Sequence, residues 1–489
     1  MFTSFAIAIV AAAAAPLPLK VVGDQITANG KPIHLHGIDV CGMEWSGKGE
    51  NVTRSVPVAF DRWHANIVRL PLCQDRWFGK TDDSPDGGVP YRKMVDEVVQ
   101  EASERGKYVL LDLHWSDGNE WGKNIGQRTM PDDNSLLFWK DCAARYKNNP
   151  AVLFDLYNEP VECPWSVWRD GGEVTDNVNG SQLRYHAVGM QTLLEVIRGV
   201  GAKNVVLAGG LGYSSRLDFP DEAELRDPGG QGVVYGNHFY PGWENIPSWE
   251  KRILAFRKRG LPLLLGEFGA EPDQGNVQEA AHRASAMVTE LKKLDLNWIA
   301  WCFHPQASPC MISDWNYTPT VYFGAYVKAA LEGREVAVAP RAESAPDKAV
   351  YRDGLAGGWQ SWGNGSVDFG YTGMSHGGTK SMRCLLAQGQ RLQLGNVPFD
   401  GNAYKAVSLW LNGGSDGGQR LVLEASVLDT APASVVQLPI LKANEWIHVV
   451  VPFKDLGIEG KEDVKSFTIR PPEGAPEFFL DDFVIEGKR

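Results

Sequence analysis

Eight short apolar segments alternate with amphipathic segments over most of the first 330 residues of the chain. The apolar segments span residues 33–40, 65–72, 107–115, 151–160, 204–210, 233–240, 261–269 and 297–305. Nearly all are apolar on both faces, as parallel strands covered by helices are. Between them, segments such as 91–106 and 277–295 repeat apolar residues every three or four positions, which is typical of helices. Eight β-then-α units predict an α/β chain with a (β/α)8 barrel.

A doubly wound open sheet is the alternative arrangement of the same elements. It is disfavoured because no glycine-rich phosphate loop follows the first apolar segment. The pattern changes after residues 333–349, which are rich in Ala, Pro and charge and are typical of a linker. Residues 350–489 then show short alternating runs and many glycines, which predict an antiparallel β-sandwich. The predicted domains are therefore a barrel at 17–332, a linker at 333–349 and a sandwich at 350–489.

The N-terminus and the charge balance set limits on location and partners. Residues 5–15 are apolar and Pro16 follows, which predicts a cleaved signal peptide over residues 1–16 and a secreted, extracellular protein. No other segment is long and apolar enough to span a membrane. The net charge of −12 argues against nucleic acid and anionic membranes as partners. Seventeen Trp residues suit a protein that stacks aromatic rings on sugars. A monomer is expected.

The seven cysteines raise the possibility of disulfides in an exported chain. They are Cys41, Cys73, Cys142, Cys163, Cys302, Cys310 and Cys384. Six of them precede residue 311, so these six could form disulfides and leave Cys384 unpaired. Cys302 and Cys310 are the simplest pair by sequence distance, and Cys41 and Cys73 could meet at one rim of the barrel. No spacing resembles a zinc site, and no metal is expected.

Two apolar segments end on a glutamate. Residues 151–160 read AVLFDLYNEP and end with Asn158 and Glu159, and residues 261–270 read LPLLLGEFGA and place Glu267 near the end. A strand end that turns into a loop explains either glutamate alone. Catalytic groups of a (β/α)8 barrel lie at the C-terminal ends of its strands, so both carboxylates should lie at one rim. Two carboxylates at one site are what hydrolysis of a glycosidic bond requires.

The remaining segments bring further polar and aromatic groups to the same predicted rim. These are Arg69, His114, Trp115, His238, Tyr240, Trp301 and His304, with Glu44 and Trp45 in the loop after the first segment. Any one of them could be a structural residue, but together they predict a site. Arg69 could supply positive charge, the Tyr240 hydroxyl could donate a hydrogen bond, and Trp301 could offer a ring face to a sugar.

These segments in this order resemble glycoside hydrolase family 5. The resemblance covers residues 20–335 and rests on Asn158-Glu159-Pro160, Gly266-Glu267-Phe268-Gly269, His238-Phe239-Tyr240, Arg69, His114, Trp301 and Trp45. It implies retaining hydrolysis of β-linked glycans without metal or cofactor. Carried over, Glu159 is the general acid/base and Glu267 the nucleophile. Asn158 binds the sugar 2-hydroxyl, and His238 and Tyr240 orient the carboxylates.

The sequences of residues 154–160 and 303–320 are most similar to those of the endo-β-1,4-glucanases of that family, which makes a β-glucan the expected partner. A β-mannanase or a β-1,3-glucanase would share the same catalytic frame, and endo action rests on the resemblance alone. A catalytically dead carbohydrate-binding barrel is disfavoured, because burying a carboxylate pair is costly. A metal-dependent hydrolase lacks a ligand cluster, since His34 and His36 alternate along one segment as packing residues would.

The C-terminal segment resembles the jelly-roll modules that accompany such enzymes. Four tryptophans in it, Trp359, Trp362, Trp410 and Trp446, could form a glycan-binding platform. The alternative is that one or two of them belong to the core and none binds, since alternation does not say which face of a strand is exposed.

Overall fold

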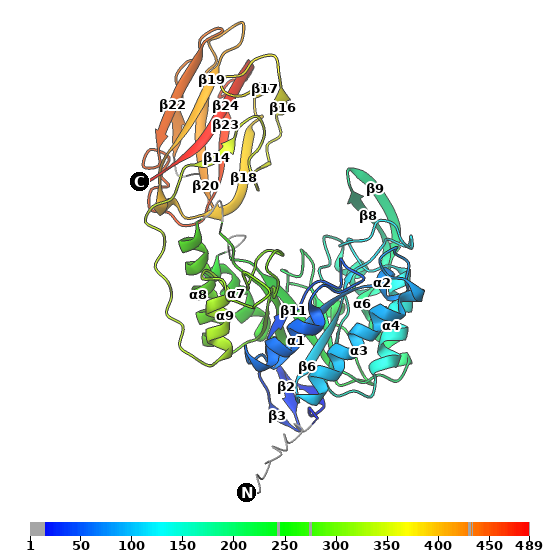
Figure 1. Cartoon of the computed structure of the whole chain (residues 1–489). Coiled ribbons are helices and arrows are strands. Elements are labelled where there is room, and N and C mark those ends of the chain that lie inside the picture. Colours follow the sequence, from blue (N-terminus) through cyan, green and yellow to red (C-terminus); the bar gives the residue numbers. More distant parts are fainter. Residues whose placement is uncertain (1–14, 242–244, 273–275, 429–431, 433, 489) are drawn as a thin grey trace, which may run out of the picture. The chain divides into compact units, whose positions relative to one another are not determined.

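The computed structural model describes residues 15–241, 245–272, 276–428, 432 and 434–488 (Figure 1). Residues 1–14 of the predicted signal peptide therefore lie outside the described residues. Among the residues that are described, no helix is both long and apolar enough to cross a bilayer.

Eight parallel strands form a closed barrel, as predicted. They are β4 (His36–Asp39), β5 (Ile67–Cys73), β6 (Tyr108–Trp115), β7 (Val152–Asp155), β10 (Val206–Gly209), β11 (Val233–Phe239), β12 (Leu263–Phe268) and β13 (Asn297–Ala300). Each lies within or overlaps one of the eight apolar segments, and β13 pairs with β4 to close the ring. Almost every residue of these strands is buried, which is why the segments are apolar on both faces.

Helices surround the barrel strands in Figure 1. They are α1 (Val52–Asp61), α2 (Gln74–Trp77), α3 (Val89–Glu104), α4 (Asp133–Tyr146), α5 (Trp165–Asp170), α6 (Met190–Gly199), α7 (Ile246–Arg257), α8 (Val277–Lys293) and α9 (Gly324–Leu331). The helix α4 shows how the sequence sets a helix start: the Asp132 carboxylate accepts from the Ser135 N–H, and the Ser135 hydroxyl bonds back to the Asp132 N–H. This reciprocal cap satisfies two backbone donors that would otherwise lack partners.

Two small sheets were not expected from the sequence. The strands β1 (Leu19–Val22), β2 (Gln25–Ala28) and β3 (Lys31–Pro32) form an antiparallel sheet before the barrel. Its Leu19 and Ile26 pack on residues from the starts of the barrel strands, so this sheet covers the N-terminal end of the barrel. The second is a hairpin of β8 (Gly172–Val178) and β9 (Ser181–Ala187), inserted between α5 and α6 and visible beyond the neighbouring loops in Figure 1.

The C-terminal unit consists of two antiparallel sheets around their own apolar core. The first contains β16 (Ser366–Tyr371), β17 (Ser381–Leu386), β24 (Ala475–Gly487), β19 (Tyr404–Asn412) and β22 (Trp446–Pro452), and β14 (Lys348–Tyr351) also pairs with β24. The second contains β15 (Gln360–Ser361), β18 (Leu392–Phe399), β23 (Val464–Arg470), β20 (Val422–Val427) and β21 (Val435–Gln437). An all-β unit after the barrel is therefore confirmed.

The four tryptophans of this unit do not share one surface. Trp359 is 4% exposed and belongs to the core. Trp362 directly follows β15 of the second sheet, whereas Trp410 and Trp446 lie on β19 and β22 of the first sheet. The Trp410 ring stacks on His376 at 3.7 Å and on His448 at 4.6 Å between ring centroids. A platform of all four residues is therefore wrong, since one of them is buried and the others lie on two different sheets.

Candidate active site

Arg69 lies at the centre of the site, on β5 and fully buried. Its guanidinium forms close contacts with four carboxylates from four other strands. These are Glu267 at 2.7 Å, Asp155 at 2.9 Å, Asp112 at 3.1 Å and Asp39 at 3.2 Å. It also donates to the Asn158 side-chain oxygen at 2.8 Å. Arg69 therefore ties β4, β6, β7 and β12 together at one level of the barrel.

The protons on these carboxylates decide where the negative charge resides. Burial raises the pKa of Asp39 well above its usual value, despite the neighbouring Arg69 charge. Burial likewise raises the pKa of Asp155 well above its usual value. Burial and the neighbouring carboxylates therefore favour the protonated forms of Asp39 and Asp155, whereas the Arg69 charge opposes them.

Glu267 is held as an ionised carboxylate. One of its oxygens accepts from Arg69 at 2.7 Å, and the other accepts from the Tyr240 hydroxyl at 2.6 Å. Burial alone would raise the pKa of Glu267, but the charges of His238, Arg69 and His114 and the hydrogen bond from Tyr240 lower it to about 2. A carboxylate of this kind remains ionised over the whole physiological pH range, which is the form that a nucleophile requires.

Glu159 is the more exposed partner of the pair. Its side chain is 20% exposed, against 5% for Glu267. His238 Nδ1 lies 2.9 Å from a Glu159 oxygen and 3.5 Å from a Glu267 oxygen. A register shift between Asn237 and His238 places His238 opposite Glu267. The glycine before Glu267 is required here, because a Cβ on Gly266 would lie 2.9 Å from His238 Nε2.

An oxygen of Glu159, a ring nitrogen of His238 and an oxygen of Glu267 all lie within 4.8 Å of one another. Among the described residues, this is the one group of acidic, His or Cys side chains close enough to hold a metal ion. The Arg69 guanidinium already lies 2.7 Å from Glu267. A metal cation at this position would therefore stand next to another positive charge, which disfavours its binding.

Asn158 and His114 complete the buried part of the site. The Asn158 side-chain amide lies 3.2 Å from His114 Nε2 and donates to the side-chain oxygen of Gln127 at 3.0 Å. His114 Nδ1 lies 2.6 Å from Asp112; burial lowers the pKa of His114, but the charge and hydrogen bond of Asp112, together with the Glu44 charge, raise that pKa overall. The His114 ring stacks on the half-buried Trp301 at 5.4 Å between centroids. Trp301 thus joins the predicted residues through His114.

Trp45 lies in a different contact group. Its indole N–H donates to Glu50 at 2.8 Å, and its ring meets His304 edge-on at 5.7 Å. His304 Nε2 lies 2.6 Å from the other Glu50 oxygen, and the Trp315 ring meets His304 edge-on at 4.8 Å between centroids. The structure therefore does not bring Trp45 into contact with the Glu159–Glu267 pair, although both follow barrel strand ends.

Sequence reasoning missed several contributors. Gln127 lies in the long loop after β6, where its amide donates to the Glu159 carbonyl oxygen at 2.6 Å. Tyr213 lies in the loop after β10, is 54% exposed and has a positive φ of 57°. The next residue, Ser214, donates its hydroxyl to the Asn158 carbonyl oxygen. Neither loop shows a periodic pattern that would have drawn attention to these residues.

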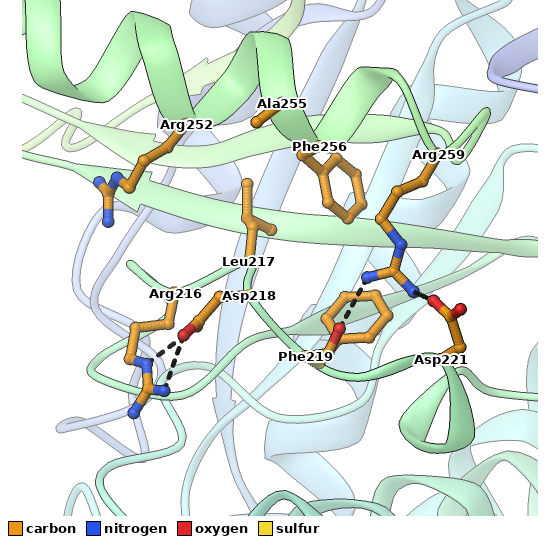
Figure 2. A pocket seen from close by; sticks show the side chains of 9 residues that line it. All are labelled: Arg216, Leu217, Asp218, Phe219, Asp221, Arg252, Ala255, Phe256 and Arg259. Carbon is orange, nitrogen blue, oxygen red and sulfur yellow. Dashed lines mark hydrogen bonds and ion pairs between the residues drawn. The ribbon is translucent and has the colours of Figure 1, made fainter.

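A cavity of about 570 Å³ lies outside this site, between α7 and the loop after β10 (Figure 2). Its cationic side chains are engaged with neighbours: Arg216 pairs with Asp218, and Arg259 pairs with Asp221 and lies over the Phe219 ring at 4.2 Å. Its lining contains none of the predicted catalytic residues. The polar groups that can perform chemistry are those around Glu159 and Glu267, so this cavity is not the candidate active site.

Comparison with known proteins gives an independent view of the same region. A family model described as cellulase, glycosyl hydrolase family 5, matches residues 26–307. The cellulase CelDZ1 of a Thermoanaerobacterium species is 24% identical over 333 residues, which cover 64% of this chain and 79% of that protein. The endoglucanase MaCel5A of a Microbulbifer strain is 24% identical over 331 residues, which cover 65% of this chain and 58% of that protein.

A solved structure is similar to the barrel. It is a β-glucanase from Saccharophagus degradans in complex with cellotetraose, with a TM-score of 0.51 and 20% identity. The match covers 65% of this chain and 94% of that one. At 20% identity, this similarity supports the fold alone.

Proposed function

The chain belongs to glycosyl hydrolase family 5, the cellulase family of enzymes that hydrolyse glycosidic bonds, and on that premise we propose that it is an endo-β-1,4-glucanase that acts by double displacement. The observation that carries the proposal is the contrast between the two glutamates. Glu267 is buried, ionised and held by Arg69 and Tyr240, whereas Glu159 is partly exposed beside it. Retaining hydrolysis requires two carboxylates with such different roles.

In the first step, Glu267 attacks the anomeric carbon while Glu159 gives its proton to the departing glycosidic oxygen. A glycosyl ester on Glu267 and a free sugar hydroxyl result. In the second step, Glu159 removes a proton from water, which attacks the anomeric carbon and releases Glu267. The spacing supports this sequence. One oxygen of each group lies within 4.8 Å of the other, a close approach that fits the roughly 5–5.5 Å between the carboxyl groups of retaining enzymes.

The surrounding residues support these roles. Arg69 and Tyr240 stabilise the anionic form of the nucleophile and the carboxylate that leaves in the second step. His238 lies between the two glutamates, where it can orient Glu159. Asn158 is fixed by Arg69 and His114, and we assign its side-chain amide to the sugar 2-hydroxyl, which would replace Gln127 as its partner. Trp301 stacks on His114 and can offer its other ring face to a sugar.

The choice of β-1,4-glucan rests on the relatives. Two of them are named a cellulase and an endoglucanase, and the similar solved structure contains cellotetraose. β-Mannan and β-1,3-glucan remain the alternative substrates for the same catalytic frame. We also propose export through residues 1–16 and action as a monomer, on the sequence arguments given above.

The test combines a substrate panel with two variants. Product release is measured on carboxymethyl cellulose, mixed-linkage β-glucan, galactomannan and laminarin. Release from the first two would support the β-1,4-glucanase. Release from only galactomannan or only laminarin would replace the substrate and keep the mechanism. No release from any polymer by the wild type would refute the proposal.

An aryl cellobioside with an acidic phenol leaving group separates the roles of the glutamates. That leaving group departs without a proton, so Glu159→Gln should keep the first step and show a burst of phenol followed by a slow steady state. Glu267→Gln should show neither burst nor turnover while keeping its melting temperature within a few degrees. A burst from Glu267→Gln, or wild-type turnover by either variant, would contradict the assignment.

A further inference from the structure

The segment directly after Trp301 begins and ends with a cysteine. Residues 302–310 read CFHPQASPC. The Cys302 N–H donates to the Pro309 carbonyl oxygen at 3.0 Å, and the Met311 N–H donates to the Cys302 carbonyl oxygen at 3.0 Å. Both peptide groups flanking Cys310 are thus hydrogen-bonded to Cys302, which places the two cysteines opposite each other. Residues facing each other in this way are held at about the 4.8 Å spacing of neighbouring strands, which lies within the roughly 4.4–6.8 Å between the α-carbons of disulfides.

The two side chains point to the same place. Cys302 Sγ lies 3.1 Å and Cys310 Sγ 3.3 Å from the carbonyl oxygen of Ala307, and both thiols donate to it. All seven cysteines are free thiols in the structure. Cys302 is fully buried, whereas Cys310 is partly exposed, so a reagent can reach the pair from one side. Burial raises the pKa of Cys310 to about 11, so its attack on an oxidant should be slow near neutral pH and faster as the pH rises.

The residues between the two cysteines hold aromatic residues at the rim of the barrel. The Trp301 indole N–H donates to the carbonyl oxygen of Ser308 at 3.2 Å. His304 Nδ1 accepts from the N–H groups of Gln306 and Ala307 at 3.0 Å, and its other nitrogen lies 2.6 Å from Glu50, the partner of Trp45. The segment also packs closely on the end of β12, since a Cβ on Gly269 would lie 2.8 Å from Pro309. Its conformation therefore sets the position of two aromatic residues on the rim.

We propose that Cys302 and Cys310 are a disulfide-forming pair whose oxidation closes residues 302–310 into a ring and fixes the loop that holds Trp301. The reaction is thiol–disulfide exchange with a disulfide oxidant, either an oxidised dithiol protein or glutathione disulfide. One protein thiolate attacks the oxidant and releases one thiol, and the second protein thiolate then displaces the other. One S–S bond is broken and one is formed, the protein loses two hydrogens, and the oxidant leaves as two thiols.

Cys41 is the competing partner. It lies beside Cys302, close enough for their thiols to interact. Cys41 and Cys302 are both buried, at 3% and 0% exposed, so an oxidant reaches neither directly. The partly exposed Cys310 is the thiol that meets the oxidant first, and its facing neighbour Cys302 then completes the exchange. A Cys41–Cys302 bond is thus an outcome that would overturn the proposed pairing.

The test uses the full-length protein, treated with glutathione disulfide, unfolded in the presence of an alkylating reagent and digested. Trypsin releases residues 294–328 as one peptide that contains only these two cysteines. In the oxidised protein this peptide should escape alkylation and be two hydrogens lighter. Chymotryptic cleavage after Phe303 should give two fragments that separate only on reduction. Alkylated Cys302 and Cys310 after treatment, or a link from Cys302 to Cys41, would refute the proposal. This mapping does not depend on enzymatic activity, so its failure is distinct from failure of the proposed function.

Kinetics test the effect of the disulfide on substrate binding. The oxidised protein should bind a soluble β-glucan oligosaccharide more tightly, with KM about two- to fivefold lower than the reduced protein and kcat changed less, because a fixed loop loses less freedom on binding. Cys310→Ser should keep the KM of the reduced protein in both conditions. Cys163→Ser, another partly exposed cysteine, is the matched control and should respond like the wild type. A KM that still depends on reductant in Cys310→Ser would contradict the role assigned to the pair.

Discussion

The hydrogen bond from Tyr240 to Glu267 offers the sharpest test of the electrostatics of the site. Tyr240→Phe removes one hydroxyl and leaves the ring in place. In the wild type that hydroxyl lies 2.6 Å from one Glu267 oxygen, while Arg69 contacts the other. The Glu267 side chain is only 5% exposed, so water cannot easily replace the lost donor. The variant should therefore hold the anionic form of Glu267 less strongly.

The size of the effect follows from the geometry. A hydrogen bond to a charged group contributes about 1.5–3 kcal/mol when its partner is buried. At about 1.4 kcal/mol per pKa unit, losing it should raise the pKa of Glu267 by about 1–2 units. The wild-type pKa is about 2, so the variant should titrate near 3–4. Because Glu267 must be ionised to attack, activity is present above its pKa and lost as the pH falls through it.

The assay is kcat/KM for a soluble β-glucan as a function of pH, from initial rates short enough to precede acid unfolding. The acid limb of the profile reports the nucleophile of the free enzyme. For Tyr240→Phe this limb should move up by about 1–2 pH units. Tyr326→Phe, which removes a hydroxyl on the outer helix α9, is the matched control and should leave the limb in place. An unshifted acid limb in Tyr240→Phe would refute the account of how Glu267 is kept ionised.

Three further predictions concern other parts of the barrel. Arg69→Met should lower the free energy of unfolding by about 3–5 kcal/mol in urea titrations, because it leaves buried carboxylates without their cation. A loss below about 1 kcal/mol would contradict the central role of Arg69. Trp301→Ala should raise KM for oligosaccharides about tenfold or more with a smaller change in kcat, whereas an unchanged KM would exclude Trp301 as a sugar platform. Asp117 is buried beside Asp132, and burial and that neighbour raise its pKa to about 9, so its contribution to stability is lost as the pH rises toward 9. Asp117→Asn, which mimics the protonated acid, should therefore gain stability relative to the wild type as the pH rises from 5 to 8.5, by up to about 1.4 kcal/mol per pH unit. A stability difference that stays constant over this range would refute the raised pKa of Asp117.

The barrel could be predicted because its strands are buried on both faces. Segments such as 107–115 and 261–269 had to be apolar throughout, and the observed strands β6 and β12 fall inside them. The hairpin β8–β9 escaped prediction for the opposite reason. It is largely exposed, as the alternating burial of β8 shows, and its sequence GEVTDNV is polar. A polar segment of this kind looks like a loop unless its cross-strand partner is known.

The same physics limited the prediction of the site. Glu159 and Glu267 were found because they end apolar segments, whereas Asp39, Asp112 and Asp155 lie inside such segments and were passed over. Their placement was itself a signal. An acid within an otherwise buried strand needs a cation or a proton, since an unpaired buried charge is too costly. Lys107 begins its segment, so Arg69 is the one Lys or Arg inside a predicted barrel segment, and the cluster could be inferred by matching buried charges across strands.

The protonation of that cluster could not be inferred from residue types, because it depends on distances. Arg69 contacts four carboxylates, and if all four were ionised, its single positive charge would leave Glu267 surrounded mainly by like charges and raise its pKa. Instead, burial raises the pKa of Asp39 and of Asp155, and each can keep its proton. Around Glu267, the charges of His238, Arg69 and His114 and the hydrogen bond from Tyr240 together outweigh its burial, which is why a carboxylate in the middle of an acidic cluster has a pKa of about 2 rather than a raised one.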